Sequence, residues 1–514
     1  MEVRLFFEFL QVAIGNRESL SHELSDNEWQ DIFRLLKEHA LLGVGFTAVE
    51  RLHAKGVVCP MQLRMQWYAL VVQIERRNEQ LNGLCKEVTE HYEHDGLSTC
   101  ILKGQGNILN YPKKLGVRRQ SGDIDVWAVP FENEECRMKK QRSAAEGKAN
   151  EECSEEDGGI AIAVQTGKNE VEYVEYHGHK AIREYVMMQY RLKGIDAHPK
   201  ACYHHIDAPD MDGIEVEVHY RPTFCRSFIR NRRMQKWFDT FASECMSNRT
   251  SEGFAVPTAS FNVVYQMAHL FEHYFEGGIG LRQMMDYHFT LKVWQKEIME
   301  WKSQQSQGMW SEGLGTAVMS AQEVMAVLRS FGMGKFASAV MYVLQEVFFK
   351  NEECRMKKQR SAAEGKANEE CSEADDVVER ELSQIKRELK EIGPQADEVS
   401  EQQLFTHCKF KEEFIKLKQV SKIGQQLKEK CVCEPWMICE PNEKEGKKLL
   451  EEIMKGGNFG QYDTRDAALK KGGMMKHGLW KLKRVMRLVR SYPEEALWEP
   501  VFRVYHLIWR LVHK

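Results

Sequence analysis

The sequence predicts an α+β protein, with a small mixed sheet flanked by helical regions on both sides. Residues 98–130 read as a strand, a glycine turn, a short helix and a second strand that carries two aspartates. Residues 213–222 alternate apolar and polar side chains, which is typical of a half-buried strand. Before and after these segments, apolar residues recur at helical spacing. These three patterns together indicate the fold class.

The composition fits a globular protein large enough for more than one domain. The chain has 514 residues, of which 43% are hydrophobic, and 72 basic against 76 acidic side chains give a formal charge of −4. This balance neither requires nor excludes nucleic acid. The 14 cysteines show no paired framework, so we expect free thiols and a cytoplasmic location. No basic leader with a cleavage site and no apolar run of about 18 residues is present, so we expect neither a signal peptide nor a membrane span.

Residues 1–95 are expected to be helical. Ser25 and Glu28 have the spacing of a capping box, in which each side chain satisfies a backbone N–H of the other residue. Trp29 and the apolar residues after it follow at helical spacing, and a second helical pattern covers residues 61–94. We interpret these apolar residues as core packing.

A glycine turn follows the first expected strand, at residues 99–102. Gly104 and Gly106 allow a tight turn and a close approach of the backbone. The turn leads into a short helix, whose first N–H groups favour an anion, and Lys103 lies at the entrance. The chain has no Walker A pattern, so a phosphate group bound here would not be held by a P-loop.

Two acidic strands carry the candidate metal ligands. Asp123 and Asp125 are two residues apart, so on a strand they lie on the same face, roughly 6.5 Å apart along the strand axis. In the later strand one face is apolar and the other carries Glu215, Glu217 and His219. A third carboxylate from this strand would complete an oxygen-rich site for a divalent cation, which can activate a hydroxyl and stabilise a leaving pyrophosphate.

An identical segment of 23 residues occurs twice, at 133–155 and at 351–373. Neither copy contains Ile, Leu, Val, Phe, Tyr or Trp, so neither can bury a core. We interpret both copies as solvated insertions, the first within the sheet-bearing domain. Each copy has two cysteines that are 17 residues apart without a C-x-x-C pair, which does not favour a metal site.

The remaining chain is expected to be mostly helical. Residues 465–490 hold nine basic residues and one acid, which we interpret as a solvated basic face rather than a nucleic-acid surface. The expected organisation is an N-terminal helical region (1–95), a core (96–222, with the repeat at 133–155 inserted), a helical domain (223–349), a charged insertion (350–432) and a C-terminal helical region (433–514).

The segments LKGQGN and RRQSGDIDVW, followed by EVHYRP, resemble the nucleotidyltransferase superfamily typified by DNA polymerase beta. Across most of the chain outside the insertions, the sequence resembles a bacterial family of uncharacterised nucleotidyltransferases. The matching segments include SDNEWQDIF, NVVYQMAHLFEHYFEGGIGLRQMMDYHF, CEPNEKEG, GGNFGQYDTR and YPEEALWEPVFRVYHLIWR. The resemblance implies a polymerase-beta-like core that transfers a nucleoside monophosphate from an NTP to an acceptor hydroxyl, which belongs to a small molecule, a sugar, a protein or RNA.

The resemblance also implies roles for individual residues. Asp123, Asp125 and Glu217 would be catalytic and would bind Mg²⁺ or Mn²⁺. The implied nucleotide-binding residues lie in the glycine turn and just before the aspartate-bearing strand: Lys103, Gly104, Gly106, Arg119, Ser121 and Gly122. The superfamily turn is usually Gly-Ser, whereas this chain has Gly104-Gln105 and lacks the hydroxyl that often contacts a phosphate.

Several alternatives stay open at this point. The altered turn and the insertions also fit a catalytically silent binding or scaffold protein with the same fold. Two interpretations of Arg119 are open: its side chain contacts a triphosphate, or it faces solvent. Arg282 and Asp286 form an ion pair within one helix or line the active cleft.

A short motif for a different enzyme class is also present. His269, Glu272 and His273 match the H-x-x-E-H motif of inverted zinc proteases. Because short motifs often match by chance and the segment is rich in aromatic residues, we regard a zinc protease as a remote third possibility.

Overall fold

The computed structural model describes residues 3–130, 159–165, 171–196, 199–306, 318–349, 437–465, 470 and 473–512. Both repeat copies and the charged insertion at 350–432 lie outside these ranges, so the interpretation of them stays a prediction. The described residues belong to one compact unit, formed by Met1–Phe349 and Trp436–Lys514. In the described part of the chain, no helix combines the length and the apolar character needed to cross a membrane.

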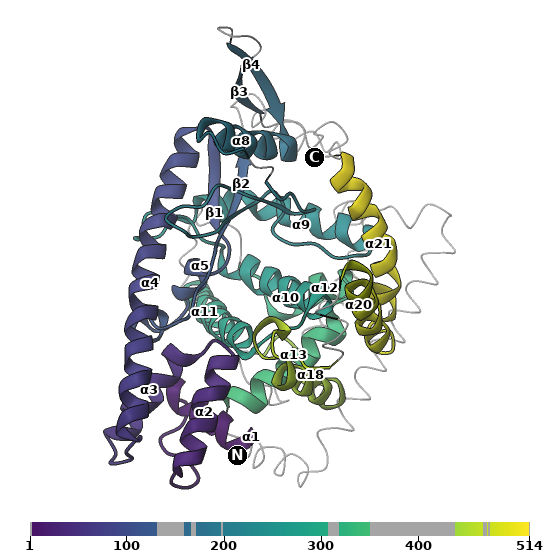
Figure 1. The fold of residues 1–514 in the computed structure, drawn as a ribbon. Helices are drawn as coiled ribbons and strands as arrows, with labels where there is room; N and C mark the ends of the chain where they lie inside the picture. Colours follow the sequence, from purple (N-terminus) through teal and green to yellow (C-terminus); the bar gives the residue numbers. More distant parts are fainter. Residues whose placement is uncertain are drawn as a thin grey trace. The chain divides into compact units, whose positions relative to one another are not determined.

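The described chain begins with helices that precede the sheet (Figure 1). They are α1 (Val3–Ile14), α2 (Asp26–Glu38), α3 (Leu42–His53) and α4 (Met61–His94). The expected capping box is present, because Ser25 and Glu28 each bond the backbone of the other residue at the start of α2. Trp29 and Trp67 are completely buried and pack around Phe9. The predicted helical character of this region is therefore confirmed.

The central sheet is small and mixed, as predicted. Its strands are β1 (Leu97–Ile101), β2 (Ile124–Pro130), β5 (His205–Asp207) and β6 (Val216–His219), in the order β1-β2-β6-β5. Strands β2 and β6 run parallel, whereas the outer pairs are antiparallel. The antiparallel hairpin of β3 (Gly159–Gln165) and β4 (Val171–His177) forms a separate sheet. Two short helices, α5 (Gln105–Ile108) and α6 (Lys113–Gly116), connect β1 to β2.

The two faces of the central sheet differ in chemistry. On one face, Val126 of β2 and Val218 of β6 pack in an apolar cluster with side chains of α4 and of α8 (Gly178–Leu192). The opposite face carries Asp125, Glu217 and His219, because residues alternate along each strand. Strand alternation thus places the polar residues of both central strands on one side.

Helices that follow the sheet complete the fold (Figure 1). They are α9 (Phe228–Ser247), α10 (Ala259–Glu276), α11 (Leu281–Ser306), α12 (Ala321–Ser330), α13 (Gly334–Phe348), α18 (Glu443–Gly456), the 3-10 turn η1 (Asn458–Gly460), α20 (Met474–Leu488) and α21 (Pro493–Val512). One large apolar core contains side chains from the N-terminal helices, from α9–α13 and from the C-terminal helices. The five-region division of the chain stays a prediction.

His39 joins the N-terminal helices to α11 and predicts sensitivity to acid. Its imidazole is fully buried, stacks near Phe6 and accepts a hydrogen bond from the backbone N–H of Leu281 at 3.4 Å. Burial lowers the pKa of His39 to about 4 from its ordinary value of 6.5. Below pH 6.5 the imidazole of His39 therefore binds a proton in the unfolded chain, whereas in the folded chain it stays neutral until the pH falls to about 4. We expect this one residue to remove about 3 kcal/mol of unfolding free energy between pH 7 and pH 4.

Urea unfolding at several pH values tests this expectation. The variant His39→Gln keeps an acceptor for Leu281 but cannot be protonated, so its stability should fall less steeply below pH 6.5. The control His53→Gln removes an exposed imidazole and should keep the wild-type slope. Identical slopes in all three proteins would show that His39 does not contribute to acid sensitivity.

Candidate functional site

Asp125 and Glu217 are neighbours across the central pair of strands. The parallel register of β2 and β6 places Asp125 opposite Glu217, and strand alternation directs both side chains to the polar face of the sheet. Asp125 is almost completely buried. His219 Nε2 lies 3.1 Å from Asp125 Oδ1 and 3.4 Å from Glu217 Oε2. These three residues form one of the groups in the described chain whose ligand atoms are close enough to hold a metal ion.

Asp123 occupies a different position from the other two acids. It comes directly before the first residue of β2, where the N–H of Ile124 continues the ladder to the carbonyl oxygen of Glu215. Its pKa is raised, first by the Asp125 carboxylate and then by burial. Asp123 lines the cavity beside Asp125, but among the described residues it belongs to none of the close ligand groups. Glu215, which shares a face of its strand with Glu217 in the sequence pattern, is exposed.

Lys103 reaches into the site from the end of β1. Its Nζ atom lies 2.7 Å from Asp125 Oδ1. Burial disfavours the charged ammonium, but the carboxylates of Asp125, Glu217 and Asp123 outweigh burial and raise the pKa of Lys103. Burial likewise opposes ionisation of Asp125, and Lys103 and His219 outweigh it, so the pKa of Asp125 is lowered. The ammonium is therefore the positive partner of Asp125 in this structure.

The glycine turn before α5 shapes the site through its backbone. Gly104 has φ 56° and ψ −107°, and a Cβ atom there would lie 3.2 Å from the carbonyl oxygen of Asp123. Gly106 does not line the cavity; a Cβ atom there would lie 2.4 Å from the carbonyl oxygen of Ile101. Gly106 thus permits close packing of α5 on the sheet, whereas Gly104 faces the cavity.

The variant Gly106→Ala tests this packing. We expect it to lower the free energy of unfolding by about 1–3 kcal/mol, because the new methyl group would push α5 away from β1. The matched control is Gly83→Ala in α4, where the methyl group meets open space and alanine favours the helix. Chemical denaturation of both variants is the measurement, and equal stabilities would contradict the close approach at Gly106.

Gln105 turns away from the cavity. Its amide donates hydrogen bonds to the carbonyl oxygen of Asn78 at 3.1 Å and to Asn82 Oδ1 at 2.5 Å. Both partners belong to α4, and the Gln105 side chain is buried. The residue that replaces the usual serine of this turn therefore anchors the turn to a helix.

Arg119 is buried and paired with an acid of α11. It donates from Nε to Asp286 Oδ1 at 2.6 Å, from Nη2 to Asp286 Oδ2 at 2.7 Å and from Nη1 to Ser121 Oγ at 2.7 Å. Tyr111 also donates to Asp286 Oδ1, at 2.6 Å. The alternative of a solvent-facing Arg119 is therefore wrong, because the guanidinium is held inside the molecule by a bidentate ion pair.

Arg282 and Asp286 do not form the expected pair within the helix. Asp286 bonds Arg119, and Arg282 Nη1 instead donates to the carbonyl oxygen of Gln120 at 2.6 Å. Both residues line the cavity, which is the second of the two alternatives. Gly122 also lines this cavity, whereas Ser121 contacts it only through Arg119.

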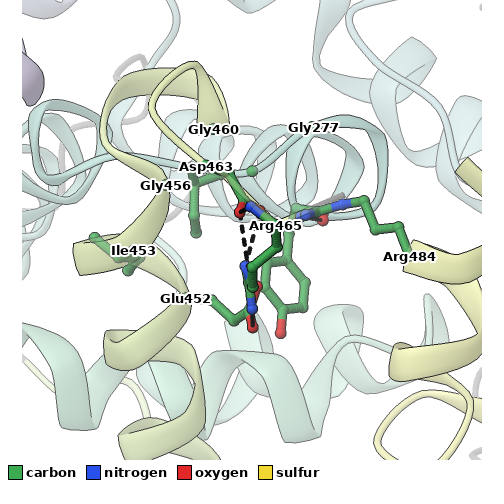
Figure 2. A pocket seen from close by; sticks show the side chains of 11 residues that line it. Gly277, Glu452, Ile453, Gly456, Gly460, Asp463, Arg465 and Arg484 are labelled. Carbon is green, nitrogen blue, oxygen red and sulfur yellow. Dashed lines mark hydrogen bonds and ion pairs between the residues drawn. The ribbon is translucent and has the colours of Figure 1, made fainter. Parts of the chain in front are cut away.

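A C-terminal turn reaches the same cavity. Phe459, in η1, lines the cavity with φ 51°, and its ring centroid lies 5.3 Å from the Arg282 guanidinium. Figure 2 shows how this turn is held: Arg465 binds the carboxylates of Glu452 and Asp463, at 2.5–2.9 Å. A Cβ atom at Gly460 would overlap the carbonyl oxygen of Gly277, so only glycine permits this contact between the two loops.

The two histidine rings of the zinc-protease motif contact each other, with centroids 4.2 Å apart, but Glu272 is directed elsewhere. Glu272 accepts a hydrogen bond from Thr223, while His269 lines the cavity and His273 contacts the ring of Phe459. Within the described part of the chain, these three residues do not form a group that could hold a metal ion. The motif is therefore explained by helix packing.

Several residues near the acids had no role predicted from the sequence. His219 was visible on the acidic face of its strand, two residues after Glu217. His205 and Asp207 lie on β5, opposite His219 and Glu217, but a strand of three residues gives only a weak pattern. Phe459 lies in the segment GGNFGQYDTR, which contributed to the family resemblance, but no role at the cavity was assigned to it.

Comparison with known proteins identifies the family. The pattern of the family described as "uncharacterised nucleotidyltransferase" matches residues 25–308, which include the glycine turn, both acidic strands and the residues that line the cavity except Phe459. No curated protein and no solved structure matches the chain. Since the match covers more than half of the sequence, the chain belongs to this family of uncharacterised nucleotidyltransferases.

Proposed function

We propose that the protein is a polymerase-beta-like nucleotidyltransferase that uses Mg²⁺ or Mn²⁺ to move a nucleoside monophosphate from an NTP to an acceptor hydroxyl. The observation that carries this proposal is the register of β2 and β6, which sets Glu217 beside Asp125, a residue that lines the cavity. Membership of a nucleotidyltransferase family supports the same reaction class.

The donor set fits a divalent cation. Asp125 and Glu217 supply carboxylate oxygens, and Asp123 lies close enough for its pKa to respond to both acids. Lys103 already provides a positive charge at Asp125, as a cation would. Asp123, Asp125 and Glu217 would hold the ion. When bound, the ion supplies positive charge that activates the acceptor hydroxyl and neutralises the leaving pyrophosphate.

Basic side chains around the cavity suit a triphosphate. Lys103, Arg119 and Arg282 line it together. Arg282 Nε and the side-chain nitrogen Nε2 of Gln283 are buried and have no hydrogen-bond acceptor among the described residues. Two such donors beside a cavity favour an anionic oxygen as the missing partner. When a divalent cation balances the negative charge of Asp125, the Lys103 ammonium would instead bind phosphate oxygens of the NTP.

The reaction follows from this arrangement. The acceptor hydroxyl releases its proton to water, its oxygen forms a bond to the α-phosphorus, the bond from that phosphorus to the bridging oxygen of the β-phosphate breaks, and pyrophosphate leaves. The basic residues orient the triphosphate and stabilise the charge that develops on its oxygens, so most of the catalysis is positioning and electrostatics.

A catalytically silent binding protein is the second candidate. Two observations favour it: Lys103 neutralises Asp125, and Gln105 replaces the serine of the turn with a side chain directed at α4. Such a protein would bind an NTP in the cavity without transferring the nucleotide.

Labelling with α-phosphorus-labelled NTPs separates the two candidates. The full chain is incubated with each NTP, Mg²⁺ and cell extract, beside the double variant Asp123→Ala, Asp125→Ala. We expect a labelled product with the wild type and none with the variant. Equal labelling by the two proteins, or none by the wild type, would contradict nucleotidyl transfer.

A further inference from the structure

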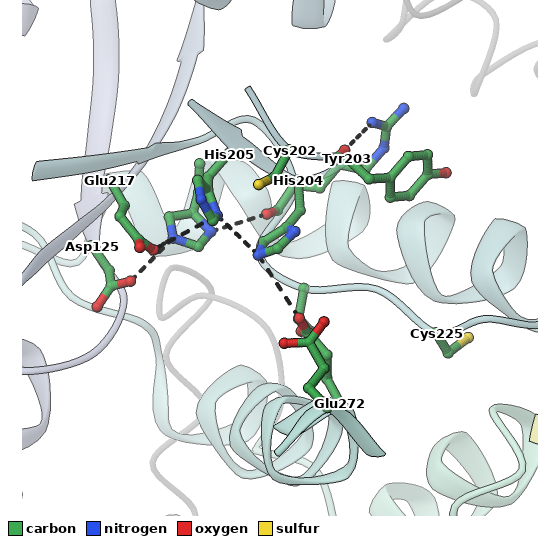
Figure 3. Close-up of polar contacts among 12 residues, drawn as sticks. Asp125, Cys202, Tyr203, His204, His205, Glu217, Cys225 and Glu272 are labelled. Atoms are coloured by element: carbon green, nitrogen blue, oxygen red, sulfur yellow. Dashed lines mark hydrogen bonds and ion pairs between the residues drawn. The ribbon is translucent and has the colours of Figure 1, made fainter. Parts of the chain in front are cut away.

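Three histidines gather at the end of the polar sheet face. His204 and His205 come from the start of β5, and His219 is the last residue of β6, directly opposite His205. His205 and His219 are buried, and His204 is half-buried. Figure 3 shows His205 beside Glu217 and His204 on the side of His205 that faces Glu272, with Asp125 next to the Glu217 carboxylate.

Neighbouring donor atoms in this cluster are spaced like the ligands of a metal ion. His204 Nε2 lies 3.0 Å from His205 Nδ1, which lies 3.6 Å from Glu217 Oε2. Glu217 Oε2 in turn lies 3.4 Å from His219 Nε2. In a four-coordinate zinc site with bonds of about 2.0–2.1 Å, neighbouring ligand atoms are roughly 3.3 Å apart. The three imidazoles also lie close enough together to share one ion.

The outer ring nitrogens of His219 and His205 lie near oxygen atoms, whereas His204 Nδ1 has no hydrogen-bond partner among the described residues. His219 Nδ1 lies 3.4 Å from the carbonyl oxygen of Arg221, to which it can donate. His205 Nε2 lies 3.5 Å from Asp207 Oδ1. A metal-binding histidine usually directs its second nitrogen to a carbonyl or carboxylate, which fixes the ring and leaves the inner nitrogen as an acceptor. Two of the three rings therefore present an inner nitrogen to the cluster.

We propose that His204, His205 and His219 bind one first-row transition-metal ion of the Zn²⁺ class, with the carboxylate of Glu217 beside His205 and His219. Three imidazole nitrogens favour such an ion over Mg²⁺, which prefers oxygen ligands. The site goes beyond the proposed function, which requires only an oxygen-bound cation at Asp123, Asp125 and Glu217. Glu217 belongs to the carboxylate site and lies beside the histidine site, so the two ions would be neighbours, as in enzymes with two metals.

Cobalt is a suitable probe, because Co²⁺ takes the place of Zn²⁺ and absorbs visible light. We would titrate the metal-stripped full chain with Co²⁺, without nucleotide, and then add Zn²⁺. The expected result is one Co²⁺ per chain with the intense absorption of a four-coordinate ion, displaced by one equivalent of Zn²⁺.

Variants assign the ion to this cluster. His204→Ala, which removes a half-buried ring, should weaken Co²⁺ binding at least tenfold, and so should His219→Ala. Asp207→Asn should weaken Co²⁺ binding about 10–100-fold, because Asp207 orients the ring of His205. His53→Gln removes an exposed histidine of α3 and should bind like the wild type. Circular dichroism checks that each variant is folded; if His219→Ala is not, His204→Ala and Asp207→Asn decide.

Two results would overturn the site: no stoichiometric Co²⁺ binding by the wild type, or wild-type affinity in folded His204→Ala and Asp207→Asn. Because the readout needs neither NTP nor acceptor, a negative result here leaves nucleotidyl transfer to its own test. Equally, a protein that binds Co²⁺ through the histidines but labels no product would retain this site.

Discussion

Asp286→Ala is expected to lower the free energy of unfolding by about 3–5 kcal/mol. The Asp286 carboxylate is buried and accepts hydrogen bonds from Arg119 and from Tyr111. Without it, the buried Arg119 guanidinium loses its counter-charge, and nearby Arg282 adds repulsion. Breaking a buried ion pair costs more than replacing both partners, because one charge is left uncompensated.

A double variant and a surface control make this prediction specific. Arg119→Met with Asp286→Leu removes both charges and should recover most of the lost stability. Asp31→Ala removes an aspartate that pairs with Arg34 at the surface and should change stability by less than about 1 kcal/mol. Urea unfolding of the four proteins is the measurement. A loss of unfolding free energy below about 1 kcal/mol in Asp286→Ala would mean that the buried pair contributes no more to stability than a surface ion pair does.

The second large effect is expected at Asp125. Asp125→Asn keeps the shape of the side chain and an acceptor for His219, but removes the charge that a cation requires. If the cation supplies about 4 kcal/mol of transition-state stabilisation, pyrophosphate release from an NTP should fall roughly 10³-fold. We expect a comparable loss in Glu217→Gln, because Glu217 is the neighbouring ligand.

Glu215→Gln is the matched control for these variants. Glu215 lies two residues before Glu217, is exposed and belongs to no metal-compatible group in the described chain. Its replacement should leave the rate of pyrophosphate release unchanged. Equal losses at Glu215 and Glu217, or full activity in Asp125→Asn, would place the chemistry elsewhere.

The parts of the fold that follow from local sequence were predictable. The capping box at Ser25 and Glu28 and the alternation around Glu217 need only neighbouring residues to specify them. The glycines of the turn at 104–106 indicated a close backbone approach, and Gly106 packs against the carbonyl oxygen of Ile101. In each case a short-range steric or hydrogen-bonding rule is enough.

The contacts that complete the site join residues far apart in the chain. Arg119 pairs with Asp286 across 167 residues, although Arg282 was the nearer candidate on the same helix. Phe459 reaches the cavity from a turn far beyond the acidic strands. No local pattern selects such partners, because they depend on how separate helices pack. The histidines of β5 were missed for the same reason: their role depends on pairing with β6.

Nucleotide-dependent binding of Mn²⁺ tests the carboxylate site most directly, because it requires no knowledge of the acceptor. Electron paramagnetic resonance would count bound Mn²⁺ with and without an NTP analogue that has a non-cleavable α–β bridge. Zn²⁺ would be present at one equivalent to fill the histidine site. We expect the wild type to bind additional Mn²⁺ only with the analogue, and Asp123→Ala with Asp125→Asn to lose that binding. Equal nucleotide-dependent binding by the two proteins would contradict a metal site built on these acids.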